Sequence, residues 1–332
     1  MRPPPRWVRR VVLAPAEVAL AAVLLCSLPL WLIAALALSP FAPGRLRPLR
    51  AGWVAFVYLM LSAFGLVTML LLWIAAGFGR WVRRPPFQRA HYRLAGWVLR
   101  VLFWQARWAL RLNIVIRGPD PDQVAPGQPL LVLCRHAGPG DSFILTHALI
   151  NWFDREPRIV LKDTLQWDPM VDVLLHRLPS RFIAPGTEHA EAAVGALAVD
   201  LDPDDAFVIF PEGGNFTPAR WQRAIDRLHA LGLERMAARA EAMPNVLAPR
   251  PGGALAALAA APEARVVLVA HTGLEHLVTI GDIWRELPMD KTITMQWWAE
   301  PAADLPSSRE ARIDWLYDRW RRIDEWIAAQ RR

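Results

Sequence analysis

Two long stretches without charged side chains stand near the amino terminus of this 332-residue chain. One covers the 21 residues 18–38 and the other the 29 residues 51–79. At ~1.5 Å per helical residue, each can cross a hydrocarbon core ~30 Å thick. A secretory signal peptide has an apolar region of only ~7–15 residues before a small-residue cleavage site, so the first stretch is longer than the apolar region of an export signal. We therefore expect residues 1–93 to form a membrane-anchoring hydrophobic helical hairpin.

Arginines on both sides of this hairpin predict its orientation. They precede the first stretch and follow the second, so the positive-inside rule places both ends in the cytoplasm. Three arginines in the connecting loop (Arg45, Arg47 and Arg50) argue against a complete crossing, and Pro29 is expected to bend the first helix. A re-entrant hairpin, with both helices dipping in and returning, therefore stays open. Either form predicts a protein of the cell membrane, with the rest of the chain on the cytoplasmic side.

The charge is distributed unevenly along the chain. Residues 1–111 carry 15 Arg and a single acidic residue, Glu17, and the remaining residues have a net charge of −7. Because the arginines flank hydrophobic stretches rather than aromatic stacking platforms, they favour membrane lipids as partners and not nucleic acid. The two cysteines, Cys26 and Cys134, are too few for a disulfide framework, and their separation suggests no metal pair.

Residues 94–111 have the pattern of an interfacial helix. Arg93, Arg100 and Arg107 recur every seven residues, and Trp97, Trp104 and other apolar side chains oppose them. Guanidinium groups would face lipid phosphates while indoles lie at the headgroup boundary. A helix packed on the following domain, with its arginines in water, fits the pattern equally well. We assign this helix to a second domain, residues 94–332.

From residue 112 onward, short apolar, β-branched runs alternate with helical patterns, which predicts an α/β layered domain with a mostly parallel sheet. The expected strands are 113–116, 130–134, 158–161, 181–184, 206–210, 246–248, 265–270 and 292–297. The expected helices are 142–153, 169–176, 188–199 and 219–241. Residues 308–330 have an amphipathic helical pattern that would cover the sheet or touch the membrane.

The strand expected at 130–134 leads into the first chemically suggestive motif. His136 follows it, then the turn Gly138-Pro139-Gly140, then Asp141 at the start of the next helix. The Asp141 carboxylate would accept a hydrogen bond from one ring nitrogen of His136, and the other nitrogen would take a proton from a substrate hydroxyl. The alternative is that Asp141 only caps its helix and that His136 is a core residue.

A second motif follows the strand expected at 206–210. There the chain continues as Pro211-Glu212-Gly213-Gly214. A carboxylate followed by free backbone N–H groups can hold a polar head or orient donors toward a developing oxyanion. By itself the sequence is only that of a turn.

Taken together, the two motifs resemble those of glycerolipid acyltransferases of the 1-acylglycerol-3-phosphate acyltransferase type. His136-x4-Asp141 is followed about seventy residues later by Phe210-Pro211-Glu212-Gly213, and the segments around Lys162 and Arg250 look like further family segments. The resemblance covers about residues 112–300. It implies an enzyme of the fold expected above that transfers an acyl group from acyl-CoA or acyl carrier protein. The acceptor would be a lysophospholipid hydroxyl, foremost that of 1-acylglycerol-3-phosphate, and the product phosphatidic acid.

The same resemblance implies roles for individual residues. His136 would be the general base and Asp141 its orienting partner, Glu212 and Gly213 would form part of the acceptor site, and Lys162 and Arg250 would bind its phosphate. No cofactor or metal is implied beyond the acyl donor as co-substrate.

Two departures from the family pattern keep other readings open. Gly214-Asn215 stands where the family usually has Thr-Arg, and Arg181-Phe182-Ile183 lacks the arginine that usually ends that motif. A hydrolase of lipid esters or thioesters could use the same His136–Asp141 pair. A non-catalytic lipid-binding protein descended from the enzyme would also fit the altered residues.

Overall fold

The computed structural model describes residues 3–42, 44, 46–124, 126–138, 140–183, 190–273, 280–300 and 304–331. The expected positions Pro139, Ala184 and 188–189 therefore lie outside the described residues. The chain divides into two compact units. The first consists of Met1–Asn113, Val160–Pro185 and Thr279–Lys291, and the second of Ile114–Ile159, Gly186–Val278 and Thr292–Arg332.

The first unit begins with a helical segment that bends sharply. Its successive parts are α1 (Arg6–Val8), η1 (Arg9–Leu13), α2 (Ala14–Cys26), α3 (Leu28–Leu38) and η2 (Ser39–Phe41). The part before Ser27 and the part after it meet at 71°. Pro29 has no N–H to continue the helix, and the Ser27 hydroxyl donates a hydrogen bond to the carbonyl oxygen of Val23 at 2.8 Å. The bend expected from Pro29 is confirmed.

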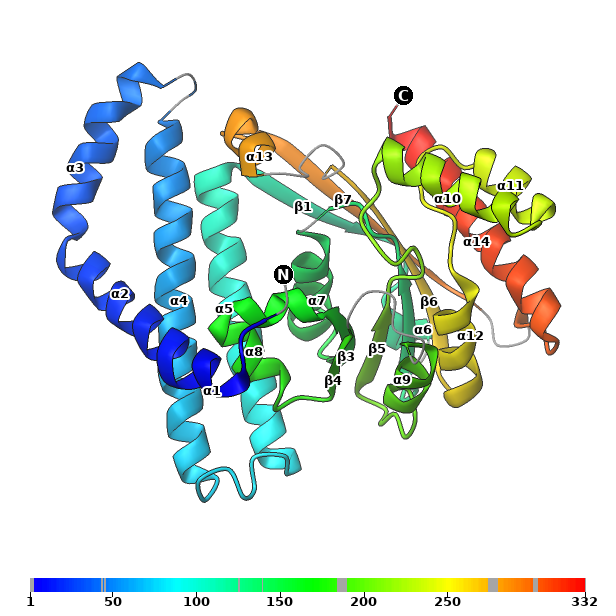
Figure 1. Cartoon of the computed structure of the whole chain (residues 1–332), viewed down its shortest axis with the longest axis horizontal. Coiled ribbons are helices and arrows are strands. Elements are labelled where there is room, and N and C mark those ends of the chain that lie inside the picture. The colour runs from blue at the N-terminus through cyan, green and yellow to red at the C-terminus, as the bar shows by residue number, and fades with distance from the viewer. Residues whose placement is uncertain are drawn as a thin grey trace. The chain divides into compact units, whose positions relative to one another are not determined.

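Two long helices, α4 (Arg47–Ala75) and α5 (Pro85–Leu110), lie side by side in the first unit (Figure 1). The unit also contains η3 (Asp163–Trp167), α8 (Pro169–Leu175), β4 (Ser180–Ile183) and α13 (Ile280–Glu286). Apolar side chains of α4, α5 and α8 form one core, with Met69 only 1% exposed. Because α5 begins at Pro85, the boundary expected between residues 93 and 94 falls inside a helix.

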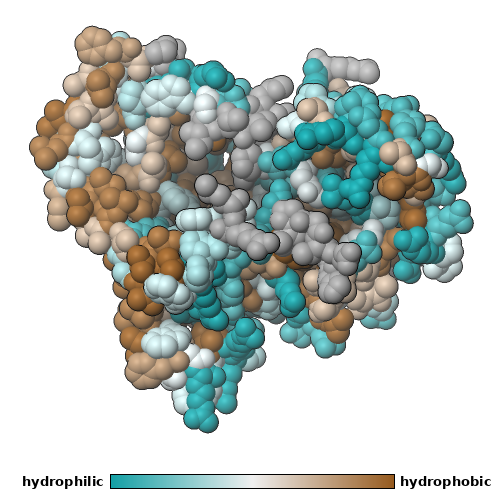
Figure 2. Space-filling model, in the orientation of Figure 1, coloured by the Kyte–Doolittle hydropathy of each residue, from teal (hydrophilic) through white to brown (hydrophobic). Residues whose placement is uncertain are grey.

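An apolar surface covers part of the first unit. Among the described residues, α4 alone is long and apolar enough to cross a membrane as a single helix, and the bent pair would provide a second, broken span. Figure 2 shows hydrophobic side chains gathered over α2, α3 and α4. Residues that expose more than half of their surface here include Val23, Leu30, Ile33, Leu36, Leu70 and Leu71.

A seven-stranded sheet has the order β1-β7-β6-β2-β5-β3-β4. The strands besides β4 are β1 (Leu112–Arg117), β2 (Leu130–Cys134), β3 (Glu156–Lys162), β5 (Asp205–Ile209), β6 (Arg265–Thr272) and β7 (Lys291–Ala299). β2 pairs in parallel with β5 and β6, β3 pairs in parallel with β5, and β7 is antiparallel to β6. The expected α/β fold with a mostly parallel sheet is confirmed. The end of β3 from Val160 onward, the start of β1 and all of β4 belong to the first unit.

The helices of the second unit correct two expectations. They are α6 (Pro121–Val124), α7 (Asp141–Asn151), α9 (Ala190–Leu197), α10 (Pro218–Ala230), α11 (Glu234–Glu241), α12 (Pro251–Ala260) and α14 (Arg309–Gln330). The helix expected at 219–241 is two helices, because Gly232 adopts a left-handed φ of +68° between them. The strand expected at 246–248 is irregular chain. The C-terminal helix α14 packs on β6 and α12, so it covers the sheet.

A buried ion pair joins the amino-terminal helical segment to α8 within the first unit. Arg9 is 6% exposed, and its Nε donates a hydrogen bond to Oδ1 of the fully buried Asp172 at 3.0 Å. Arg9 also donates to the Gln166 side chain at 2.8 Å. Burial would raise the pKa of Asp172, but hydrogen bonds from His176 and Arg9 hold it at about 2. The carboxylate is therefore ionised at neutral pH.

Replacement of this carboxylate should destabilise the first unit strongly. Asp172→Ala leaves the Arg9 guanidinium buried without its counter-charge, which costs about 3–5 kcal/mol of unfolding free energy. The exposed pair Arg285–Asp282 provides the control, since Arg285→Ala should cost less than about 1 kcal/mol. Urea titration of the purified protein in detergent, followed by circular dichroism, measures both. Equal effects of the two substitutions would contradict the structural role of Asp172.

Candidate active site

The candidate site lies where β2 and β5 end at the same edge of the parallel sheet, the usual place for ligands in such folds. All five residues of β2 are buried. The Arg135 N–H then donates to the Val269 carbonyl oxygen at 3.0 Å, which continues the ladder to β6 by one residue. His136 therefore leaves the sheet at a fixed point. Its own carbonyl oxygen accepts a hydrogen bond from the Phe216 N–H at 2.8 Å, beyond the end of β5.

His136 and Asp141 are in contact, as their spacing predicted. The distance from His136 Nδ1 to Asp141 Oδ2 is 2.9 Å. Asp141 is the first residue of α7, and its Oδ2 also accepts hydrogen bonds from the backbone N–H groups of Ala137 at 2.8 Å and Gly138 at 3.1 Å. The carboxylate thus points back into the turn that separates the two residues, and it holds that turn closed.

This contact fixes the tautomer of His136. An ionised carboxylate can only accept, so Nδ1 carries the proton and Nε2 keeps its lone pair. Burial would raise the pKa of Asp141, but hydrogen bonds from His136 and His271 hold it well below its ordinary range, which keeps the acceptor ionised. The His136 side chain is 14% exposed and its ring lies against Phe210, with centroids 4.6 Å apart. The pair can therefore serve as a general base and its orienting partner.

Glu212 occupies a different place from the one expected. The sequence suggested that its carboxylate would line the acceptor groove, but the residue is 2% exposed. Its two oxygens accept hydrogen bonds from the backbone N–H groups of His136 and Leu247, each at 3.2 Å. Burial raises the pKa of Glu212 to about 7, although the Arg135 charge and these two N–H groups oppose the rise. Glu212 therefore joins two loops instead of facing solvent.

Two guanidinium groups lie beside the turn that follows Glu212. Gly213 has a left-handed φ of +66°, and a Cβ built there would meet the Arg250 side chain at 3.3 Å. A Cβ at Gly214 would meet Arg220, which also donates to the Asn215 carbonyl oxygen at 3.1 Å. Both arginines are exposed. The structure thus places Arg250, predicted from the sequence, and Arg220 beside a turn that has lost the usual family arginine.

Two further residues, Lys162 and Cys134, lie on strands. Lys162 ends β3 and belongs to the first unit. Burial raises the pKa of the Cys134 thiol far above its ordinary value, and the charges of Asp141 and Glu212 raise it further, so Cys134 is no nucleophile. In the described part of the chain, no group of three or more His, Cys, Asp or Glu side chains could hold a metal ion.

His271 was not among the candidate residues named from the sequence. It lies near the end of β6, is 1% exposed, and its Nε2 is 3.5 Å from Asp141 Oδ2. The sequence held one signal, because His271 directly follows the apolar run 265–270 from which a strand was expected. Only the parallel pairing of β2 with β6 shows that the two strand ends are neighbours.

The pKa of Glu212 predicts a pH-dependent stability. Because the pKa is raised from 4.5 to about 7, the contribution of Glu212 to stability is fully present below pH 4.5 and is lost as the pH rises through 7. Glu212→Gln has no titrating carboxyl group at this position, so this loss should disappear. Between pH 4.5 and pH 7, the free energy of unfolding of the variant should therefore rise by roughly 3 kcal/mol relative to that of the wild type. Denaturant titrations at several pH values, with the exposed Glu325→Gln as control, measure this. Parallel curves for wild type and Glu212→Gln would contradict it.

Comparison with known proteins agrees with this geometry. Residues 115–272 match the family model described as Acyltransferase, a range that includes His136, Asp141 and Glu212. The curated proteins contain no match. The chain is also similar to the crystal structure of the 1-acyl-sn-glycerophosphate (LPA) acyltransferase PlsC from Thermotoga maritima, with 16% identity and a TM-score of 0.45 over 79% of this chain and 97% of that chain. Residues 115–272, just under half of the chain, are thus similar to the Acyltransferase family.

Proposed function

We propose that the protein is a membrane-bound acyltransferase that acylates the free hydroxyl of a lysophospholipid. The acyl donor is acyl-CoA or acyl carrier protein, and the leading acceptor is 1-acylglycerol-3-phosphate, which would give phosphatidic acid. The observation that carries the proposal is the 2.9 Å contact between His136 and Asp141 inside the matched domain. It leaves Nε2 as the base in a side chain that remains partly open to solvent.

The proposed reaction needs no cofactor and no covalent enzyme intermediate. His136 Nε2 takes the proton of the acceptor hydroxyl while the hydroxyl oxygen attacks the thioester carbonyl carbon. The tetrahedral intermediate collapses with cleavage of the carbon–sulfur bond, and the imidazolium returns the proton to the departing thiolate. Asp141 stabilises the imidazolium that exists between these two steps and keeps the ring in one orientation.

The cations beside Gly213 would hold the acceptor phosphate. Guanidinium groups bind phosphate oxygens in a bidentate manner, and Arg250 lies beside Gly213 and Arg220 beside Gly214. We propose that these two replace the arginine that the family usually has after this motif. Lys162 remains a further candidate for the same phosphate. Gly213 contributes by its lack of a side chain, since a Cβ would crowd Arg250.

The first test removes the base. His136→Ala should lower acyl transfer by about 10²–10⁴-fold, because general-base catalysis contributes this much, while the protein remains folded. The measurement is product mass after incubation of labelled acyl-CoA with a panel of lysophospholipids. His229→Ala, an exposed histidine on α10, is the matched control and should retain full activity.

Near-normal turnover by His136→Ala would overturn the proposed mechanism. Release of CoA at the same rate with and without any lysolipid would instead identify a hydrolase. Binding of lysolipid by the wild type, with no transfer from either donor, would identify a non-catalytic lipid-binding protein.

We further propose that the first unit enters one leaflet of the membrane and does not cross it. Polar side chains of residues 160–185 contact the middle of α4. The Tyr58 hydroxyl donates to Asp168, and Arg177 donates to the Met69 carbonyl oxygen at 2.6 Å. If α4 spanned the bilayer, these charged groups would lie near its centre, at a cost of several kcal/mol.

The opposite surfaces of the helices fit insertion into a leaflet. On α4 the apolar side chains Phe64, Val67, Leu70, Leu71 and Ile74 are each at least 45% exposed. On α5, Trp104 and Trp108 are 67% and 70% exposed, as suits indoles at a headgroup boundary. We therefore propose the re-entrant form of the expected hairpin, in which residues 1–93 anchor the protein together with α5.

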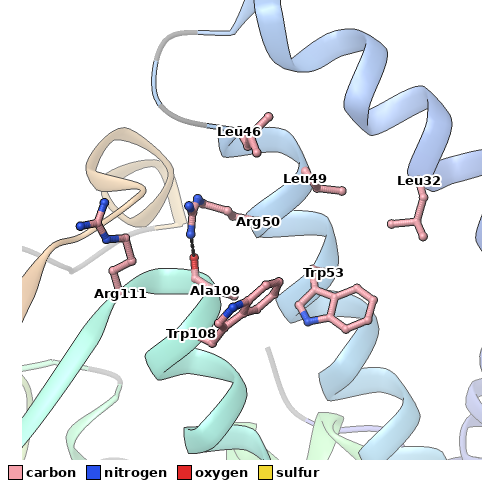
Figure 3. Close-up of a pocket in the computed structure, with 8 residues that line it drawn as sticks. All are labelled: Leu32, Leu46, Leu49, Arg50, Trp53, Trp108, Ala109 and Arg111. Atoms are coloured by element: carbon pink, nitrogen blue, oxygen red, sulfur yellow. Dashed lines mark hydrogen bonds between the residues drawn. The ribbon is translucent and has the colours of Figure 1, made fainter.

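A cavity within the first unit supports the same proposal (Figure 3). Leu32, Leu49, Trp53 and Trp108 from α3, α4 and α5 form its apolar walls, and the Arg50 side chain donates to the Ala109 carbonyl oxygen at 2.6 Å at one end. The space of about 550 Å³ is well suited to hydrocarbon. We propose that acyl chains of the leaflet fill it, and that the bend at Ser27 serves to open it.

A labelling experiment tests this arrangement. Phe41, at the end of η2, is 87% exposed and lies between the two hydrophobic stretches, so a spanning hairpin would carry it to the far side of the membrane. We expect Phe41→Cys, in a Cys26→Ser background, to be unreactive toward a membrane-impermeant thiol reagent from the far side. Oriented vesicles of both polarities measure it, with Ser307→Cys as the control for the side of the second unit. Labelling of Phe41→Cys from the far side alone would establish a spanning hairpin.

A further inference from the structure

His271 reaches the carboxylate on which the proposed catalytic pair depends. It lies near the end of β6, next to β2, and is 1% exposed. Its Nε2 is 3.2 Å from the Arg135 carbonyl oxygen and 3.5 Å from Asp141 Oδ2. Both neighbours are acceptors, so Nε2 must carry a proton, and its N–H is directed between them.

The other ring nitrogen of His271 indicates that packing alone does not explain a histidine at this position. Nδ1 is buried and makes no hydrogen bond within the described parts of the chain. A buried polar atom without a partner destabilises a fold, and an apolar side chain of similar size would avoid this cost. The interactions of Nε2 are therefore what the histidine provides at this position.

The contact adds a fourth donor to one oxygen atom. Asp141 Oδ2 already accepts from His136 Nδ1 and from the N–H groups of Ala137 and Gly138. Because His271 approaches from β6, it fixes the carboxylate from the side of the sheet, whereas the two N–H groups fix it from the turn. The negative charge that His136 faces is thus shared with a second imidazole.

We propose that His271 is a positioning residue of the active site: its Nε2–H orients Asp141 and weakens the hold of Asp141 on the His136 proton. This inference rests on the proposed function of His136 as a base. A base that is held too tightly to its carboxylate releases its proton only at high pH, so a donor on the far side of the carboxylate keeps the base free at a lower pH.

The surroundings of His271 contain several charged or titratable groups. Asp141 and His136 lie on the side of the turn, and Arg135, whose side chain donates to the His271 carbonyl oxygen at 2.5 Å, lies at the end of β2. Cys134 is close enough to Asp141, Glu212 and Arg135 to interact electrostatically, and Glu212 and Asp324 of α14 each interact with Arg135. The β7 residue paired with His271 is Met295, which does not titrate. Among these groups, Asp141 is the carboxylate that the His271 ring reaches.

Two substitutions of similar polarity separate positioning from packing. In His271→Gln the amide nitrogen can occupy the place of Nε2, whereas in His271→Asn it can reach only the place of Nδ1. We expect His271→Asn to lower kcat about 10-fold with an unchanged KM for acyl-CoA. The acid limb of its kcat/KM profile should move to higher pH by several tenths of a unit. His271→Gln should restore both the rate and the limb.

Controls keep the two proposals distinguishable. His147→Leu replaces another buried histidine, on α7, and should leave the acid limb unchanged. NMR titration of the His136 imidazole, which needs no turnover, should show the same upward shift in His271→Asn. Two results would overturn the role of His271. One is a folded His271→Asn variant whose kcat/KM acid limb and His136 NMR titration equal those of the wild type. The other is a His271→Gln variant that is as impaired as His271→Asn. A shifted titration in a protein without transferase activity would support the contact and reject the proposed function alone.

Discussion

The buried carboxylate of Glu212, a residue that is only 2% exposed, holds the candidate site together. Glu212 accepts one hydrogen bond from the N–H of His136 and one from the N–H of Leu247. Both donors are in irregular chain, where no neighbouring strand can satisfy them. The carboxylate oxygens thus accept the hydrogen bonds that backbone carbonyl oxygens of a neighbouring strand would otherwise accept. The position of the His136 backbone, and with it the imidazole, therefore depends on a hydrogen bond to a side chain.

Asp141 and Asp172, two of the buried aspartates in the described part of the chain, illustrate different uses of the same group. Asp172 is paired with Arg9, whose guanidinium never releases its proton at ordinary pH, so that contact is permanent and joins helices. Asp141 is paired with His136, whose imidazole has a second ring nitrogen that can accept a proton. Both carboxylates have a lowered pKa. The partner of each aspartate therefore determines whether the ion pair only stabilises the fold or can also take part in proton transfer.

Much of this organisation was predictable from local sequence, and the exceptions have physical reasons. β2 was predicted with its observed bounds because a strand buried on both faces is a continuous apolar run. Val246-Leu247-Ala248 has the same character, but the Leu247 N–H bonds to a side chain and not to another strand. α12 was not expected from the sequence, and it begins with Pro251-Gly252-Gly253, residue types that are common in turns. The sequence identified Glu212 as a candidate but could not show that its side chain is buried, and it did not show that His271 lies beside Asp141.

The two cysteines differ so much in accessibility that the native chain already contains a unique attachment point. Cys134 is sealed within β2, whereas Cys26 is exposed at the last residue of α2, next to the bend. A nitroxide or fluorophore coupled to the unaltered protein would therefore attach at one place only. Its collision rate with lipid-soluble oxygen and with a water-soluble nickel chelate would report how deeply the corner of the helical segment is immersed.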